Sequence, residues 1–177
     1  MGYLLERNKR NSGNAWVSGP LKSGTLANPG FGVLTQQVHF TETGAGTYTG
    51  TFVLPAGATL LDIIVDAIAL WDAATSASLE VGDATDPDGY FTAVDLKATD
   101  LLAGESLSFG LAGGVQGAYI ANSHVTPRYS ATAKTITATV ASVGAGTTGR
   151  TLVSVVYAMG KGVDANGAAI AAEATKV

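Results

Sequence analysis

The chain has 177 residues, of which 46% are hydrophobic and only 14% are charged, and its formal net charge is −4 at pH 7. This length fits one domain with a sizeable core. Soluble proteins average about 25% charged residues, so the low charge indicates a surface that partly contacts other protein. The absence of cysteine excludes disulfides, thiolate metal sites and cysteine nucleophiles. No apolar run reaches the roughly 18 residues of a membrane helix, so we expect no membrane partner.

The first 30 residues differ from the rest in charge. They contain four cations and one anion, whereas the remaining 147 residues contain six cations and 13 anions. A basic arm on an acidic body suggests a tether to an acidic partner surface, although an ordinary solvated terminus would look the same. An acidic body repels phosphate, so we expect no nucleic-acid partner.

The N-terminal segment has the composition of an arm. The turn-forming stretches NSGN, SGP and NPG interrupt it, and no hydrophobic period is sustained. We therefore predict an extended N-terminal arm over residues 1–32. Its apolar and basic side chains are the candidates for partner binding, and they are Tyr3, Leu4, Leu5, Arg7, Lys9, Arg10, Trp16 and Phe31.

Strand signals begin at Val33. The stretch VLTQQVHFTE alternates Val38 and Phe40 with polar residues, and GTYTGTFV then places Tyr48, Gly50 and Phe52 on one face. A period of two is typical of a half-buried β-strand. Glycine- and proline-containing turns, GAG and PAG, flank the second stretch.

The most apolar stretch, residues 54–83, fits two patterns. Its apolar residues recur at helical spacing, but the β-branched run Ile63-Ile64-Val65 and the neighbouring strands favour a strand. On a strand, one face is fully apolar and consists of Leu61, Ile63, Val65, Ala67, Ala69 and Trp71. Asp62 and Asp66 then share the other face about 13 Å apart, too far to hold one ion, so we interpret them as structural carboxylates.

Further strands are predicted in ASLEVGD, ESLSFGLA, KTITATVASVG and RTLVSVVYAMG, and the last of these could be buried on both faces. In ESLSFGLA, Leu107, Phe109 and Leu111 would share one face. About eight short strands with glycine-rich turns favour an all-β sandwich, of which the jelly roll is one form. We predict this domain over residues 33–160 and a flexible C-terminal tail over 161–177.

Residues 82–91, GDATDPDGYF, are the most site-like stretch. Asp83, Asp86 and Asp88 are weak candidates for a Ca²⁺ or Mg²⁺ site, because hard cations favour carboxylate clusters. Their spacing fits an EF-hand loop poorly. Asp-Pro-Asp-Gly is better explained as a β-turn, with Pro87 fixing φ and Gly89 supplying a positive φ. We therefore predict no metal site.

Nothing in the sequence indicates catalysis. His39 and His124 are the only imidazoles, and no nucleophile motif or zinc-binding histidine pair accompanies them. The glycine-rich stretches 110–114 and 144–150 lack the Lys-Ser/Thr ending of a phosphate loop. We expect neither an enzyme nor a cofactor.

Several of these motifs together resemble small structural proteins of tailed bacteriophages. The resemblance covers about residues 45–160 and rests on the LPAG turn, the Ile/Val strand, TSASLEVGD, the DPDGYF turn and the late TATV…GAGTTGRTLVSVVYA hairpin. It implies a jelly-roll virion protein, most plausibly a capsid decoration (cement) protein. Such proteins sit on the head lattice, often as trimers, and bind through extended termini and edge strands.

The resemblance implies that the partners are the major capsid protein and further copies of this chain, the latter as a homotrimer. It also implies a location on the capsid surface of the virion, after assembly in the host cytoplasm. Two alternatives remain open. A tail- or head-fibre module that binds host glycan would need an exposed aromatic platform, for which Trp71 and Tyr90 are the candidates. A polysaccharide depolymerase would need a carboxylate pair in recognisable context.

Overall fold

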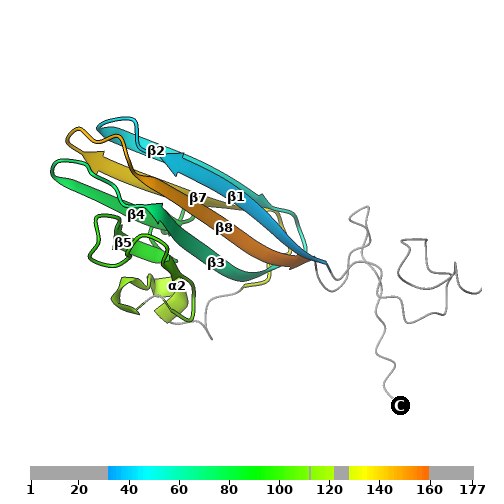
Figure 1. Cartoon of the computed structure of the whole chain (residues 1–177). Coiled ribbons are helices and arrows are strands. Elements are labelled where there is room, and N and C mark those ends of the chain that lie inside the picture. Colours follow the sequence, from blue (N-terminus) through cyan, green and yellow to red (C-terminus); the bar gives the residue numbers. More distant parts are fainter. Residues whose placement is uncertain (1–31, 112, 122–127, 160–177) are drawn as a thin grey trace, which may run out of the picture. The chain divides into compact units, whose positions relative to one another are not determined.

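A computed structural model of the protein describes residues 32–111, 113–121 and 128–159, and the description below concerns this body. It confirms the predicted all-β sandwich. Two four-stranded antiparallel sheets face each other (Figure 1), in the orders β1-β8-β3-β6 and β2-β7-β4-β5. The arm residues expected at 1–31 and the tail expected at 161–177 lie outside the described residues.

The first sheet contains β1 (Val33–Thr41), β8 (Arg150–Met159), β3 (Ala58–Ala69) and β6 (Ser106–Leu107). The second contains β2 (Gly46–Leu54), β7 (Lys134–Val143), β4 (Ser76–Gly82) and β5 (Phe91–Asp95). Two single turns, η1 (Gly113–Val115) and α2 (Ala118–Ala121), follow β6. Within the described ranges, no helix has the length and hydropathy needed to cross a membrane.

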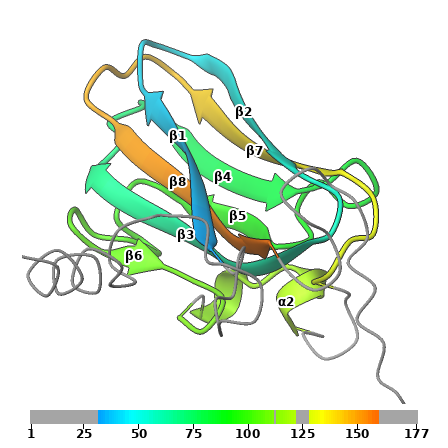
Figure 2. The same ribbon diagram turned by 90° about the vertical axis from the view of Figure 1, so that its right-hand side faces the viewer.

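The strand pairs are nested in the sequence. Strand β1 pairs with β8, β2 with β7, β3 with β6 and β4 with β5, all antiparallel. Such nesting arises when one long hairpin folds over on itself, so that its two halves alternate between the sheets, which Figure 2 shows as two layers. Two packed sheets with eight antiparallel strands in total are also the number of sheets and strands in a jelly roll.

The apolar stretch at residues 54–83 forms a strand, as predicted. Strand β3 is twelve residues long and lies between β8 and β6. The predicted apolar face is correct from Ile63 to Ala67, since Ile63, Val65 and Ala67 are all buried. It is wrong at Leu61, which is 39% exposed, whereas Leu60 is buried in its place.

A β-bulge explains this difference. The pairing with β8 shifts by one residue between Leu60 and Asp62. An extra residue in one strand reverses the alternation of its side chains, so Leu60 points inward and Leu61 outward. The sequence pattern assumes an unbroken period of two and therefore assigns the wrong face before the bulge.

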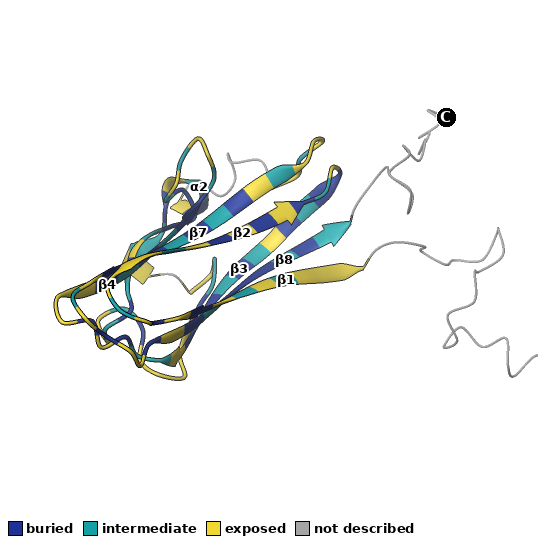
Figure 3. Cartoon of the chain, turned by 90° about the horizontal axis from the view of Figure 1, so that it is seen from above, coloured by how far each residue is buried: buried dark blue, intermediate teal, exposed yellow. Residues whose placement is uncertain are grey.

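The core lies between the two sheets. Along each long strand, buried and exposed residues alternate (Figure 3). The inward residues of β2 and β7 are those that the alternation predicts, including Phe52, Ile136, Ala138 and Val140. On β8, Val153, Val155 and Tyr157 face the core, and Ser154 on the opposite face is only 5% exposed because it is covered in part by Gln37, whose amide donates to it.

Two predictions about the middle of the chain need correction. The stretch ESLSFGLA forms only the two-residue strand β6, and Leu111 is 72% exposed rather than sharing a buried face with Leu107. Strand β5, which follows the DPDG turn, was not predicted. Its residue Ala93 has φ 47°, and the pairing of β5 with β4 shifts between Leu79 and Val81, so β5 does not alternate regularly between buried and exposed residues.

A buried carboxylate holds one end of the sandwich together. Glu42, at the end of β1, is 1% exposed. Its Oε2 accepts hydrogen bonds from the backbone amides of Asp72 (3.1 Å) and Gly149 (2.9 Å), and its Oε1 accepts one from the Ser142 hydroxyl (3.4 Å). Residue 146 must be glycine, because a Cβ there would lie 2.1 Å from Glu42 Oε1. One side chain thus joins the loop between β3 and β4, strand β7 and the loop between β7 and β8.

Asp72 adds a second carboxylate to the same end. Its Oδ1 accepts hydrogen bonds from the amides of Thr147 (2.7 Å) and Thr148 (3.1 Å). These amide bonds, first that of Thr148, lower the pKa of Asp72 from 3.8 to about 2. The aromatic ring of Trp71 lies beside it, and the indole nitrogen donates to the buried Thr151 hydroxyl at 2.9 Å.

The bulge in β3 predicts losses of unequal size when Leu61 and Ile63 are truncated. Ile63→Ala should lower the free energy of unfolding by about 2–5 kcal/mol, because it leaves a cavity in the core. Leu61→Ala should cost less than about 1 kcal/mol, because Leu61 points outward. Urea denaturation of both variants measures the difference, and equal losses would contradict the bulge.

The lowered pKa of Asp72 predicts an acid-dependent stability. A carboxylate with a depressed pKa stabilises the folded state above its unfolded-state pKa, and this contribution is lost as the pH falls toward the folded-state value. Thermal unfolding of the wild type should therefore show a Tm that falls between about pH 4 and pH 2. In Asp72→Asn this part of the pH dependence should be smaller, and an unchanged profile would show that the amide bonds do not form in solution.

Candidate interaction surfaces

The body begins and ends at the same place. Strand β1 starts where β8 finishes (Figure 1), with Val33 opposite Ala158 and the amide of Met159 donating to Gly32 O at 3.4 Å. We call this the terminal end. The predicted partner-binding residues of the arm are Tyr3, Leu4, Leu5, Arg7, Lys9, Arg10, Trp16 and Phe31, and all of them lie outside the described residues.

Exposed apolar side chains gather at the terminal end. Val33 is 64% exposed, and Leu34 beside it pairs with Tyr157. Leu61 lies in the bulge of β3 at the same level, and Tyr129 flanks β3 through a bridge to Thr59. Val53, near the end of β2, is also exposed. These five side chains (Val33, Leu34, Val53, Leu61 and Tyr129) form most of the exposed large hydrophobic residues of the described body, an arrangement typical of contact surfaces.

The acidic loop after β4 is a turn. Asp83 Oδ1 accepts hydrogen bonds from the amides of Thr85 (2.9 Å) and Asp86 (3.1 Å), which is an Asx-type turn. The amide of Gly89 donates to Asp86 O at 3.1 Å and closes the β-turn over Asp-Pro-Asp-Gly. The predicted turn is thus present, and the hydroxyl of Thr92 donates to Asp88 Oδ2 at 2.8 Å.

Gly89 is needed for a different reason from the one predicted. It is not among the residues with positive φ. Instead, a Cβ at Gly89 would lie 2.5 Å from the ring of Tyr119. Gly82 and Gly117 have the same function, because a Cβ at either would lie about 2 Å from the backbone oxygens of Asp86 or Asp88. Three glycines therefore let the loop pack tightly against the segment that precedes α2.

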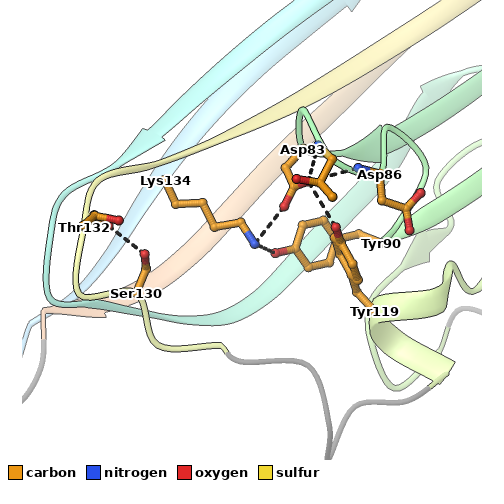
Figure 4. Close-up of polar contacts among 8 residues, drawn as sticks. Asp83, Asp86, Tyr90, Tyr119, Ser130, Thr132 and Lys134 are labelled. Atoms are coloured by element: carbon orange, nitrogen blue, oxygen red, sulfur yellow. Dashed lines mark hydrogen bonds and ion pairs between the residues drawn. The ribbon is translucent and has the colours of Figure 1, made fainter.

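Asp83 also belongs to a charged cluster with two tyrosines (Figure 4). Lys134 Nζ forms an ion pair with Asp83 Oδ2 at 3.0 Å and donates to the Tyr90 hydroxyl at 2.9 Å. The Tyr119 hydroxyl donates to Asp83 Oδ1 at 3.1 Å. The ammonium group lies 5.3 Å from the ring centroids of both Tyr90 and Tyr119. This cluster ties the start of β7 to the loop after β4.

Both members of the ion pair are stabilised in their charged forms. Burial opposes ionisation of Asp83, but hydrogen bonds from Lys134 and from the amides of Thr85 and Asp86 outweigh it and lower its pKa. Burial likewise opposes the charge of Lys134, but Tyr90 and Asp83 outweigh it and raise its pKa. The pKa of Asp86 is raised, chiefly by the hydrogen bond and charge of Asp88.

The carboxylates of Asp83 and Asp88 accept hydrogen bonds from protein donors, and Asp86 interacts with Asp88. Among residues 32–111, 113–121 and 128–159, no three His, Cys, Asp or Glu side chains are placed to hold a metal ion. Asp62 and Asp66 are structural, as predicted. Asp62 Oδ1 accepts hydrogen bonds from the amides of Ile63 (2.8 Å) and Phe109 (2.9 Å), and Asp66 accepts one from the Ser106 hydroxyl.

The aromatic platform of the glycan-binding alternative is not formed. Trp71 is 2% exposed and Tyr90 is 4% exposed, so neither ring presents a face to solvent. Tyr48 packs edge-on against Trp71, and Phe109 stacks on Tyr90. His39 lies on the exposed side of β1, and His124 lies outside the described residues.

Sequence comparison and structural comparison give different results. No protein-family model matches the chain, and no curated protein matches it significantly. A chain of the cyanophage Pam1 capsid asymmetric unit is similar in structure, with a TM-score of 0.50 and 23% identity over 81% of this chain and 99% of that one. This likeness shows that the two chains share a fold.

Two further phage capsids contain chains with weaker likeness. A chain of the acid-stable capsid of Helicobacter pylori bacteriophage KHP30 matches with a TM-score of 0.43 and 17% identity, over 71% of this chain and 93% of that one. A chain of the Ralstonia phage GP4 capsid matches with a TM-score of 0.44 and 17% identity, over 77% and 90%.

The ion pair predicts different effects for two aspartates of one loop. Asp83→Asn should lower the free energy of unfolding by about 1–3 kcal/mol at neutral pH, because it leaves the half-buried Lys134 without its charged partner. Asp86→Asn should be neutral or slightly stabilising, because it removes the repulsion from Asp88 that raises the pKa of Asp86. Urea denaturation measures both. A larger loss in Asp86→Asn would indicate that the loop has a function beyond the turn.

Proposed function

We propose that this protein is a phage capsid decoration (cement) protein, which binds the outer surface of the head and stabilises contacts between capsomers. The observation that carries the proposal is the structural likeness to a chain of the cyanophage Pam1 capsid, which extends over 99% of that chain. The likeness thus spans a whole small chain of similar length and is not limited to one domain of a larger shell protein.

The terminal end supports a function in binding. The described body begins at Gly32 and ends at Met159, and these two residues lie side by side at the end that carries the exposed side chains of Val33, Leu34 and Leu61. A protein that clamps a surface through its termini needs them on the side that faces the surface. We propose that the terminal end faces the shell and that the opposite end, held by Glu42, points away from it.

The charge distribution supports the same orientation. Segment 1–30 has a net positive charge and contains the apolar anchors Tyr3, Leu4, Leu5 and Trp16, whereas the remainder of the chain is acidic. We propose that Arg7, Lys9 and Arg10 pair with acidic groups of the major capsid protein while the apolar anchors and Phe31 enter its surface depressions. Many copies on one lattice add avidity to a weak single contact.

The proposal includes the homotrimer and the virion location that the sequence resemblance implies. The low charge of the body favours close packing of copies around an axis. The proposal assigns no enzymatic activity and no cofactor to the chain, because a protein that stabilises contacts between capsomers needs only to bind them.

Cosedimentation with phage heads that lack this protein tests the proposal. The wild type should bind the heads saturably and raise the temperature at which they rupture. Deletion of residues 1–31 should abolish binding while leaving the Tm of the body unchanged. Light scattering of the free protein measures whether it is a trimer.

A matched pair of charge reversals localises the contact. Arg10→Glu, in the arm, should weaken binding to heads and should make it less sensitive to salt. Arg150→Glu is the control, because Arg150 is exposed at the end of the body opposite the terminal end. Equal binding by all variants, or binding to tails in place of heads, would contradict the proposal.

A further inference from the structure

The two sides of the sandwich differ in how their strand edges are covered. On one side, the edge of β3 is covered by β6 and by residues 104–109 and 128–130, whose backbones bond to Ala58, Leu60 and Ala67. Strand β5 is covered there by a bridge from Phe91 to Gln116. On the other side, the edge strands β1 and β2 lie next to each other (Figure 2), and none of the described strands pairs with their outer edges.

The free edge of β2 presents a regular row of backbone groups. The amide and carbonyl of Val53 face away from β7, because both bond to the side chain of Gln36 (3.1 and 2.8 Å). The pairing of β2 with β7 has no bulge, so Thr47, Thr49 and Thr51 point their amides and carbonyls the same way. These groups have no partner within the described part of the chain.

The contact with Gln36 shows that the free edge of β2 can form a pair of hydrogen bonds with an amide group. Its side-chain amide donates to Val53 O and accepts from Val53 N, which is the pair of bonds that a backbone amide of a neighbouring strand would make. The row that continues through Thr51, Thr49 and Thr47 offers the same pair of bonds at every second residue. Natural edges that avoid association contain a lysine, a proline or a bulge, and β2 has none of these.

We propose that the free edge of β2 pairs antiparallel with the β2 edge of a second copy of this chain across a two-fold axis. In such a contact residue i of one copy pairs with residue j of the other and j pairs with i, so charges on this strand would lie close to the like charges of the second copy. Strand β2, GTYTGTFVL, contains no charged residue, and neither does the adjacent β1 apart from the imidazole of His39. The rest of the body is acidic and would repel another copy.

The side chains suit the same pairing. The exposed residues of β2 include three threonines, two of which already pair with threonines of β7 within the sheet, Thr49 with Thr139 and Thr51 with Thr137. Cross-strand threonine pairs are favourable on a sheet surface. Pairing of two β2 edges would extend this threonine face into one continuous eight-stranded sheet.

This contact goes beyond the proposed decoration role, because it concerns two copies of the body and needs no capsid. It is also compatible with a trimer. Contacts around three-fold axes combined with contacts across two-fold axes link all copies into a continuous net, whereas either contact alone gives separate clusters.

Cysteine cross-linking of the purified full-length protein tests the proposal. The natural chain has no cysteine, so a disulfide in a single-cysteine variant must join two copies. Paired edges bring Cα atoms to about 5.5 Å, within the range of a disulfide. Thr47→Cys, Thr49→Cys and Thr51→Cys are oxidised alone and in equimolar pairs, because residue i of one copy pairs with residue j of the other, and at least one variant or pair should form a disulfide-linked dimer under mild oxidation. Thr135→Cys is the control, because Thr135 is exposed on the same face but lies on the inner strand β7.

A second measurement distinguishes stable pairing of two β2 edges from disulfides that form when two molecules collide at random. The molar mass of the wild type by light scattering should correspond to a dimer, or to two trimers where the proposed three-fold contact also forms, and Thr49→Lys or Thr51→Pro should halve it without unfolding the body. Cross-linking of the three edge variants, alone and in pairs, no faster than that of Thr135→Cys would overturn the proposal. A mass that the edge substitutions leave unchanged would overturn it as well.

Discussion

The buried carboxylate of Glu42 is the constraint on which the arrangement of the sandwich depends. Its oxygens accept hydrogen bonds from Asp72 in the loop after β3, from Ser142 on strand β7 and from Gly149 in the loop before β8. A buried carboxylate without such donors would be strongly destabilising, so these segments must meet at this point. Strands β1, β3, β7 and β8 are thereby fixed in relative position at one end, and the nested pairing continues from there.

The opposite end has a different character. It contains both ends of the body and most of the exposed large apolar side chains, whereas the Glu42 end is closed by amide–carboxylate bonds. The two lateral sides differ in the same way, since one is covered by loops and the other leaves the edges of β1 and β2 free. The body thus has one end closed by hydrogen bonds, one end with exposed apolar side chains and one side with free strand edges. The last two are the surfaces for which contacts are proposed above.

Several acidic side chains of this protein stabilise the fold as hydrogen-bond acceptors or as ion-pair partners. Asp83 organises a turn and neutralises Lys134, Asp62 bonds the amide of Phe109 at the edge of β3, and Asp72 binds two consecutive amides. Sequence reasoning could recognise the turn at Asp83 because Asp, Pro and Gly have local conformational preferences. It could not recognise the partners Lys134 and Tyr119, which are distant in sequence and arrive only through the packing of β7 and α2.

The sequence by itself determined the all-β class, the strand at residues 58–69 and most inward-facing residues, because a period of two follows directly from the geometry of a strand. The same period, continued past Phe40, places Glu42 on the inner face and could have revealed it. Only the tertiary structure decided that Leu60 replaces Leu61 in the core and that Gly89 gives space to the ring of Tyr119. A bulge and a close contact depend on the neighbouring strand or ring, and no local pattern in the sequence contains that neighbour.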